Sequence, residues 1–279
     1  MLARVIGQKL HKTWGQPIIV DNRPGAGGNI GADIAAKSAP DGYTLFMANT
    51  TTLATSMPLY PRLPYDAVRD FAPVGLVATS LLVMIVPASL PVASVRDLIA
   101  LAKARPGKIH YASAGVGTQQ HLAVELFKLR AGVNIVHVAY KGGAPAVAAV
   151  ASGESQLGFT GVAVSLPLIK AGKLRAIAVS TPNRSTVFPG VPSVAESGLP
   201  GFDITPRFAL LAPARTPTPV IAKLNAEVAL VLKLPDVIER LSLIALESKP
   251  STPEQLGAIF KQEIAFFAKL ITDAGIQAE

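Results

Sequence analysis

The chain contains no cysteine among its 279 residues. This absence excludes a disulfide, a thiolate nucleophile and a cysteine-ligated zinc site. Charged residues are also sparse, at 16%, and the Lys and Arg behind the net charge of +8 are scattered along the chain. A nucleic-acid-binding surface is normally clustered and accompanied by a reading motif, and the sequence has neither. We therefore expect no nucleic-acid partner, and small acidic solutes fit the charge better.

Motifs of catalysis and metal binding are lacking as well. The sequence has no Gly-x-Ser-x-Gly elbow, no P-loop, no His-Glu-x-x-His and no acidic metal cluster. Its histidines, His11, His110, His121 and His137, are far apart in the chain and do not have metal-ligand spacing. Ser113 has no evident base partner for nucleophilic chemistry. These absences favour a binding protein without a cofactor over an enzyme.

Long apolar runs are missing too. The most apolar stretch, 74–86, is interrupted by Gly75, Thr79 and Ser80 and followed by Pro87, so it is too short to span a bilayer. We expect a pair of buried strands there. The first residues contain no long apolar segment with a small-residue cleavage site. If Met1 is the true start, the expected location is the cytoplasm.

What the sequence does contain is a regular alternation of short apolar strands and amphipathic helices, which predicts an α/β protein. Two domains are expected, one formed by residues 1–84 with 207–279 and the other by residues 85–206. The strands are predicted at 17–20, 43–48, 73–78, 81–87, 109–112, 135–138, 156–159, 174–180 and 208–212. The helices are predicted at 2–14, 32–38, 95–104, 118–131, 144–152, 166–171, 220–232, 236–241 and 253–274.

The best candidate site is the loop between the strand at 109–112 and the helix that follows. Ser113, Gly115 and Gly117 leave its backbone uncrowded, and Thr118 is placed as the helix N-cap. Free N–H groups at the positive end of a helix suit a carboxylate or phosphate. An ordinary turn without a ligand is the alternative. His121 lies one turn into the helix, where it either faces the same space or serves as a cap or core residue.

Three other loops place polar groups at predicted strand ends, where open α/β sheets bind ligands. They are Asn49 to Thr52, Tyr140-Lys141-Gly142 and Thr160-Gly161. Turn chemistry and a solvated lysine are the simpler interpretations. The Gly-rich loop 21–31 invites a dinucleotide interpretation, but Ile30 occupies a position where the fingerprint needs glycine, and no acidic residue ends the next predicted strand.

Six segments spread over the whole chain resemble one family. They are Asp21-Asn-Arg-Pro-Gly-Ala-Gly-Gly-Asn-Ile-Gly31, Ala39-Pro-Asp-Gly-Tyr-Thr44, Ala139-Tyr-Lys-Gly-Gly-Ala-Pro145, Ala171-Gly-Lys-Leu-Arg-Ala-Ile-Ala178, Val191-Pro-Ser-Val-Ala-Glu-Ser-Gly-Leu-Pro-Gly201 and Leu211-Ala-Pro-Ala-Arg-Thr-Pro217. The family is the substrate receptors of tripartite tricarboxylate transporters, also called Bug proteins.

The resemblance implies a periplasmic, monomeric receptor with a two-domain periplasmic-binding-protein fold, of the Venus-flytrap, type II-like kind. Such a receptor binds a small carboxylate, amino acid or related solute and delivers it to a membrane permease without catalysis. In the family, two loops hold the ligand carboxylate, one in each domain, and the loop of the second domain matches Ser113 to Thr118, including Ala114. The pocket walls match Asn49, Thr50 and Thr51, the loop Tyr140 to Gly142, and Thr160.

The chain departs from the family pattern in two places. Family members begin with a signal peptide, a first strand and a Pro/Gly-rich loop before the helix that starts this chain. We therefore expect either a start upstream of Met1 or an N-terminally truncated product that lacks half of the carboxylate clamp. The second departure is Arg207, after Pro206, where the family more often has an aromatic residue. It predicts either a more cationic pocket or an exposed arginine at the domain crossover.

Two other functions stay open at this point. The first is a ligand-sensing effector module, since transcription factors use similar two-lobed domains. The second is a nucleotide-dependent enzyme built on the Gly-rich loop 22–31.

Overall fold

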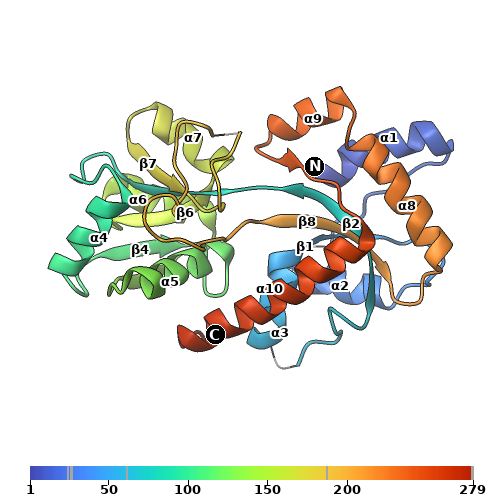
Figure 1. Cartoon of the computed structure of the whole chain (residues 1–279), viewed down its shortest axis with the longest axis horizontal. Coiled ribbons are helices and arrows are strands. Elements are labelled where there is room, and N and C mark those ends of the chain that lie inside the picture. The colour runs from blue at the N-terminus through green and yellow to red at the C-terminus, as the bar shows by residue number, and fades with distance from the viewer. Residues whose placement is uncertain (24, 26–27, 61, 187, 278–279) are drawn as a thin grey trace. The chain divides into compact units, whose positions relative to one another are not determined.

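The computed structural model describes residues 1–277 except 24, 26, 27, 61 and 187. The chain forms two compact units (Figure 1). Unit 1 consists of Met1–Thr79 and Arg207–Lys269, and unit 2 of Ser80–Pro206 and Leu270–Glu279. The sequence predicts that the chain first crosses between domains at residues 84 and 85, five residues later than it does in the structure. It also predicts that the last ten residues belong to the first domain, whereas they belong to unit 2. Strand pairing sets the earlier crossover, because residues 82–87 already pair within the sheet of unit 2.

Unit 1 contains a four-stranded sheet and the helices at both ends of the chain. Its helices are α1 (Leu2–Trp14), α2 (Asn29–Ala36), α3 (Thr50–Leu59), α8 (Thr218–Val231), α9 (Pro235–Ser242) and α10 (Pro253–Asp273), the last of which continues into unit 2. Its strands are β1 (Phe46–Asn49), β2 (Phe71–Thr79), β8 (Arg207–Pro213) and β9 (Glu247–Ser248). They pair in the order β1-β8-β2-β9, and every pair is antiparallel.

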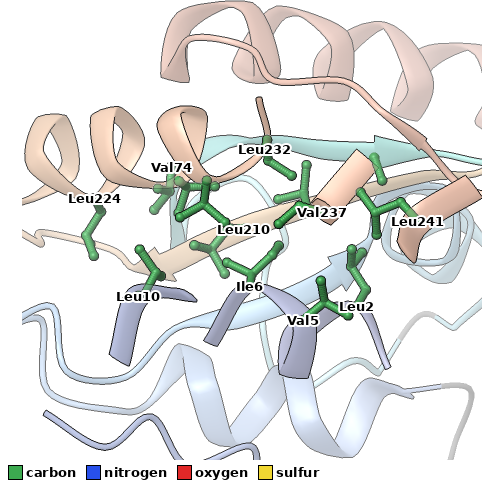
Figure 2. Packing of buried hydrophobic residues seen from close by; sticks show 14 of the residues in the cluster. Leu2, Val5, Ile6, Leu10, Val74, Leu210, Leu224, Leu232, Val237 and Leu241 are labelled. Atoms are coloured by element: carbon green, nitrogen blue, oxygen red, sulfur yellow. The ribbon is translucent and has the colours of Figure 1, made fainter. Parts of the chain in front are cut away.

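Helices α1, α8 and α9 pack together against β2 and β8. Figure 2 shows the core that they share, in which Leu2, Ile6 and Leu10 of α1 lie beneath Leu210 and Val237. The α1 residues recur at helical spacing, so a single face of the helix supplies all of them. Burying such a side chain contributes about 1.5–3 kcal/mol. The helices near the end of the chain thus pack on the sheet of the unit that begins it.

Two predictions for unit 1 are wrong. Residues 17–20 form no strand, because no described strand pairs with this run. Ile19 is 87% exposed, and Ile18 lies against Gly7 of α1. The strand that a dinucleotide motif requires before its Gly-rich loop is therefore missing, although residues 24, 26 and 27 of that loop lie outside the described part of the chain. Helix α3 was missed, because it is buried on most of its surface and shows no apolar stripe.

In the part of the chain that the structure describes, unit 2 contains a five-stranded mixed sheet and four helices. The strands are β3 (Leu82–Pro87), β4 (His110–Ser113), β5 (Val136–Ala139), β6 (Leu157–Gly161) and β7 (Leu174–Val179), and the helices are α4 (Val95–Ala104), α5 (Gln119–Ala131), α6 (Gly143–Ser152) and α7 (Val162–Lys170). The strand order is β5-β4-β6-β3-β7. The expectation that β2 and β3 pair with each other is wrong, since β2 pairs with β8 and β9 while β3 pairs with β6 and β7.

Strands β5, β4 and β6 run parallel, so their carboxyl ends meet at one edge of the sheet. Helix α5 follows β4 from this edge and α6 follows β5, and both connections are short, as βα units require. This edge collects most of the residues that the sequence singled out. The predicted α/β class with two units is confirmed. Of the helices in the described part of the chain, none is both long and apolar enough to cross a membrane.

Candidate functional site

The β4–α5 loop is fixed by its own short hydrogen bonds. The Thr118 side chain caps α5 by accepting a hydrogen bond from the His121 N–H at 3.4 Å, and its hydroxyl donates to the Gly115 carbonyl at 2.7 Å. The predicted N-cap role of Thr118 is confirmed. Gly115 and Gly117 have φ angles of 126° and 74°, which residues with a Cβ rarely adopt. The two glycines therefore allow the loop to fold back at the start of the helix.

Within this loop some amides are used internally and others are not. The Gly115 N–H donates to Ser113 Oγ at 3.1 Å, and the Gly117 N–H donates to His121 Nδ1 at 3.1 Å. The amides of Ala114, Val116 and Gln120 donate no hydrogen bond to any residue that the structure describes. All three residues are half-buried at the N-terminus of α5. Three donors without an internal acceptor thus lie close together in the chain, in the loop and first turn of α5.

The β5–α6 loop lies next to the β4–α5 loop. The Tyr140 N–H donates to the Ser113 carbonyl at 3.0 Å, and the Gly142 N–H donates to the Tyr140 carbonyl at 2.9 Å. Lys141 is exposed, and the Tyr140 hydroxyl donates to Glu154 at 2.7 Å. Thr160 is buried in β6, the neighbour of β4 on its other side. The structure therefore brings the predicted residues of unit 2 to a single sheet edge.

A stack of three rings lies behind the β4–α5 loop. The His137 ring is 4.2 Å from the His121 ring and 4.7 Å from the Tyr111 ring, centroid to centroid, and the rings are within 17° of parallel. His137 Nε2 lies 2.6 Å from Ser113 Oγ. Tyr111 and His137 are direct partners across the parallel β4–β5 pair. His121 is thus a buried side chain that contacts the loop from behind.

The stack continues into a buried ion pair on α5. Glu125 accepts a hydrogen bond from the Tyr111 hydroxyl at 2.5 Å and is paired with Lys128 Nζ at 2.7 Å. Burial, together with the neighbouring Glu125 carboxylate, raises the pKa of the Tyr111 hydroxyl above its ordinary value. Burial, with a smaller effect of His137, lowers the pKa of His121 from 6.5 to about 4, so its imidazole is neutral at pH 7.

This arrangement resembles a nucleophile with its base, but its surroundings argue against that chemistry. Ser113 is fully buried, and its hydroxyl is engaged with both the N–H and the carbonyl of Gly115. A serine nucleophile has to reach a substrate carbonyl. The Ser113–His137 contact therefore holds the loop. No group of His, Asp and Glu among the described residues could hold a metal ion.

A small cavity of about 230 Å³ opens beside the stack. It is lined by Val116, His121, Glu125 and Lys128 and by the residues that follow α10, Ala274 to Gln277. Its polar side chains are those of the ion pair, the imidazole and Gln277. The cavity therefore gives solvent a route to one side of the ring stack.

In unit 1 the predicted residues lie where β1 passes into α3. The Asn49 side chain caps α3 by accepting a hydrogen bond from the Thr52 N–H at 3.2 Å. Thr50 and Thr51 are each 1% exposed, and their hydroxyls have no hydrogen-bond partner among the described residues. Buried hydroxyls are normally satisfied, so these two are unusual.

Arg207 begins β8 in the same unit. Its Nη1 pairs with Glu263 Oε1 of α10 at 2.7 Å, and the two side chains are 21% and 7% exposed. The expectation of an exposed arginine is therefore wrong, because the side chain is mostly buried and paired with a carboxylate. A more cationic pocket stays a prediction.

Sequence reasoning missed Tyr111, Glu125, Lys128 and His137. One signal was available on α5, where His121, Glu125 and Lys128 follow one another at spacings of four and three residues and so share a helix face. His137 of β5 could be placed beside Tyr111 only from the register of the β4–β5 pair, which no local sequence pattern gives.

Comparisons with known proteins agree on one family. Residues 2–276 match the family model described as the tripartite tricarboxylate transporter family receptor. BugT of Bordetella pertussis is 38% identical over 99% of this chain and 85% of its own length.

Solved structures agree with this assignment. R. palustris Rpa4515 with adipate is 37% identical, with a TM-score of 0.84 over 99% of this chain and 93% of that one. MatC from Rhodopseudomonas palustris with bound malate is 30% identical, with a TM-score of 0.79 over 97% of this chain and 93% of that one. With its β4–α5 loop and two α/β units, the chain belongs to the tripartite tricarboxylate transporter receptor family.

Proposed function

We propose that this chain is a monomeric periplasmic receptor that captures a small carboxylate and delivers it to the permease of a tripartite transporter, without catalysing a reaction. Family membership supports the receptor role. The carboxylate class is supported by two relatives of at least 30% identity whose structures contain adipate and malate. Both solutes are dicarboxylates.

One observation in this chain carries the proposal. The amides of Ala114, Val116 and Gln120 have no acceptor among the described residues, and they belong to the loop and first turn of a 13-residue helix with no acidic residue in its first turn. A carboxylate placed there would accept charge-assisted hydrogen bonds, which are roughly twice as strong as neutral ones. The helix dipole would add about 0.3–1 kcal/mol.

The other predicted residues have separate roles in the two units. In unit 2, Ser113, Gly115, Gly117 and Thr118 shape the loop, and Tyr140, Lys141, Gly142 and Thr160 provide its neighbours on the sheet edge. In unit 1, Asn49 caps α3, and the hydroxyls of Thr50 and Thr51 supply hydrogen-bonding capacity that the described protein does not use. His121 acts from behind the loop, and Arg207 is engaged with Glu263.

The test is a panel of solutes measured by melting temperature and by calorimetric titration. Adipate, malate, citrate and glutamate are compared with adipamide, which has the length of adipate but no charge. At least one acid is expected to raise the melting temperature by several degrees, as a ligand at about 100 times its Kd does, while adipamide has no effect. A flat response by folded protein to every acid would refute carboxylate capture.

A further inference from the structure

The two stacked histidines of unit 2 each contact the β4–α5 loop from behind. His121 Nδ1 lies 3.1 Å from the Gly117 amide nitrogen, and His137 Nε2 lies 2.6 Å from Ser113 Oγ. The loop is thus held near both of its ends, Ser113 and Gly117. Neither histidine is one of the three residues whose backbone amides lack an acceptor and are proposed to bind the solute. Their effect on a solute therefore has to pass through the loop.

The bond to Gly117 fixes the protonation of His121. A backbone N–H can only donate, so Nδ1 must accept and can carry no proton. The single proton of the neutral ring is then on Nε2, which lies 3.8 Å from Glu125 Oε1. Protonating Nδ1 would place two hydrogens between Nδ1 and the Gly117 nitrogen and break this bond. The loop conformation consequently requires neutral His121.

We propose that His121 and His137 are positioning residues for solute binding: they hold the β4–α5 loop in its anion-binding conformation, and protonation of His121 releases Gly117. The inference rests on the proposed function, because the loop is the carboxylate site only under that proposal. To the proposed function it adds two residues that act through the loop without contacting the solute. It also adds a step that responds to acid, the protonation of His121.

The groups that face His121 come from every element packed against it. They are Tyr111 of β4, Glu125 and Lys128 of α5, and His137 of β5. The segment Ala274 to Gln277, which lines the adjoining cavity, contains no titratable side chain. Burial is the largest cause that disfavours the imidazolium, followed by His137. Glu125 favours it and Lys128 disfavours it by smaller amounts, so the pKa of His121 falls to about 4. The loop is therefore held in place at neutral pH and released in acid.

Two substitutions at His121 separate a positioning role from simple core packing. In His121→Asn, the side-chain oxygen stands near the place of Nδ1, so it still accepts from Gly117 and does not titrate. In His121→Leu, a buried side chain of similar bulk has no acceptor. His137→Gln is the matching change for Nε2, since its amide still reaches Ser113.

The first measurement is hydrogen exchange of the Gly117 amide in the full chain, expressed as a protection factor at pH 7 and pH 4. Wild type is expected to be protected at pH 7 and to lose about threefold to fivefold of that protection at pH 4, where about half of the molecules have a protonated His121 and lack this hydrogen bond. His121→Asn keeps its protection at both pH values, as does His137→Gln at pH 7, and His121→Leu lacks it at both. Equal protection in wild type and His121→Leu would overturn the proposal.

The second measurement is calorimetric titration with adipate. Wild type is expected to lose about twofold more affinity between pH 7 and pH 4 than His121→Asn does, because about half of the folded wild type has a protonated His121 at pH 4. Titration of adipate itself is common to both proteins and cancels in this comparison. Identical pH profiles for the two proteins would overturn the acid-sensitive step.

The two measurements distinguish the possible failures. If adipate and the whole acid panel fail to bind while Gly117 protection follows the expected pattern, the proposed function fails and the loop-positioning role of the histidines stands. If adipate binds all variants equally and Gly117 protection does not respond, the proposed function stands and the positioning role fails.

Discussion

Two residues at the start of α3 have buried hydroxyls with no hydrogen-bond partner in the described part of the protein. Thr50 and Thr51 are buried, and neither Oγ1 has a hydrogen-bond partner there. A buried polar group without a partner costs about 1–3 kcal/mol relative to a satisfied one. Such a cost is typical of functional sites, where a ligand satisfies what the free protein leaves open.

Replacing Thr50 with valine tests this interpretation, because valine has the same shape and no hydroxyl. We expect Thr50→Val to raise the free energy of unfolding by about 1 kcal/mol and to weaken carboxylate binding by about tenfold. Thr55→Val is the matched control, since the Thr55 hydroxyl is buried in the same helix but donates to the Thr52 carbonyl at 3.1 Å. Thr55→Val should lower the free energy of unfolding. If Thr50→Val lowers it by a similar amount, the interpretation of Thr50 is contradicted. Urea unfolding and calorimetry provide the measurements.

Two tyrosines offer another comparison at the residue scale. Tyr111 and Tyr140 each donate a hydroxyl hydrogen bond to a glutamate, but the Tyr111–Glu125 pair is buried and the Tyr140–Glu154 pair is exposed. We expect Tyr111→Phe to lower the free energy of unfolding by about 1–3 kcal/mol, because a buried carboxylate loses a donor. Tyr140→Phe should change it by less than about 0.5 kcal/mol. Equal losses in urea unfolding would show that burial of the Glu125 pair is unimportant.

At the scale of elements, helix α5 has a glycine in the left-handed conformation near each end. Gly117 precedes its N-cap with φ 74°, and Gly132 follows its last turn with φ 61°. Only the first belongs to the proposed carboxylate loop. Alanine at either position introduces similar backbone strain, so the pair separates strain from function.

We expect Gly117→Ala and Gly132→Ala each to lower the free energy of unfolding by about 1–2 kcal/mol. Only Gly117→Ala should also weaken carboxylate binding, by about tenfold or more, because the strained loop moves its amides. Thermal unfolding and titration with the best acid of the panel measure both effects. Comparable losses of affinity in the two variants would place the solute elsewhere.

The sequence predicted elements well where local chemistry determines them. Thr118 is an N-cap because its hydroxyl is in reach of the His121 amide, and α1 is a helix because Leu2, Ile6 and Leu10 share one face. Helix α3 was missed because its buried surface is not periodic. Residues 17–20 were assigned to a strand because a short apolar run does not reveal whether a partner strand exists.

The candidate site divides in the same way. The loop from Ser113 to Thr118 could be recognised from its small residues and its N-cap, which are local signals. The ring stack could not, because it depends on the register that places His137 opposite Tyr111. The neutralisation of Arg207 was equally hidden, since Glu263 is 56 residues away in the chain. Long-range contacts of this kind follow from the assembled sheet and not from any window of sequence.

For the molecule as a whole, lowering the pH reduces stability through two kinds of ionisable side chain, carboxylates and a histidine. Hydrogen bonds to partners such as Arg69 and Ser94 hold the pKa values of Asp70 and Asp97 below their ordinary range, so stability from these carboxylates is lost as pH falls through their lowered values. His121 acts at higher pH. It is neutral and buried in the folded protein but takes up a proton near pH 6.5 in the unfolded chain.

Below pH 6.5 the unfolded chain therefore binds one more proton than the folded protein does, until the folded His121 titrates near pH 4. The free energy of unfolding should fall as pH drops across this window, by up to about 3 kcal/mol from His121, and the contribution should level off below it. His121→Asn keeps the acceptor for Gly117 and has no proton to take up, so its stability should decline less over the same range. Urea unfolding of both proteins at several pH values between 4 and 7 isolates the effect, since the carboxylates are common to both. Parallel curves would mean that His121 is protonated as readily in the folded protein as in the unfolded chain, and the acid-sensitive hold on the β4–α5 loop would then have no physical basis.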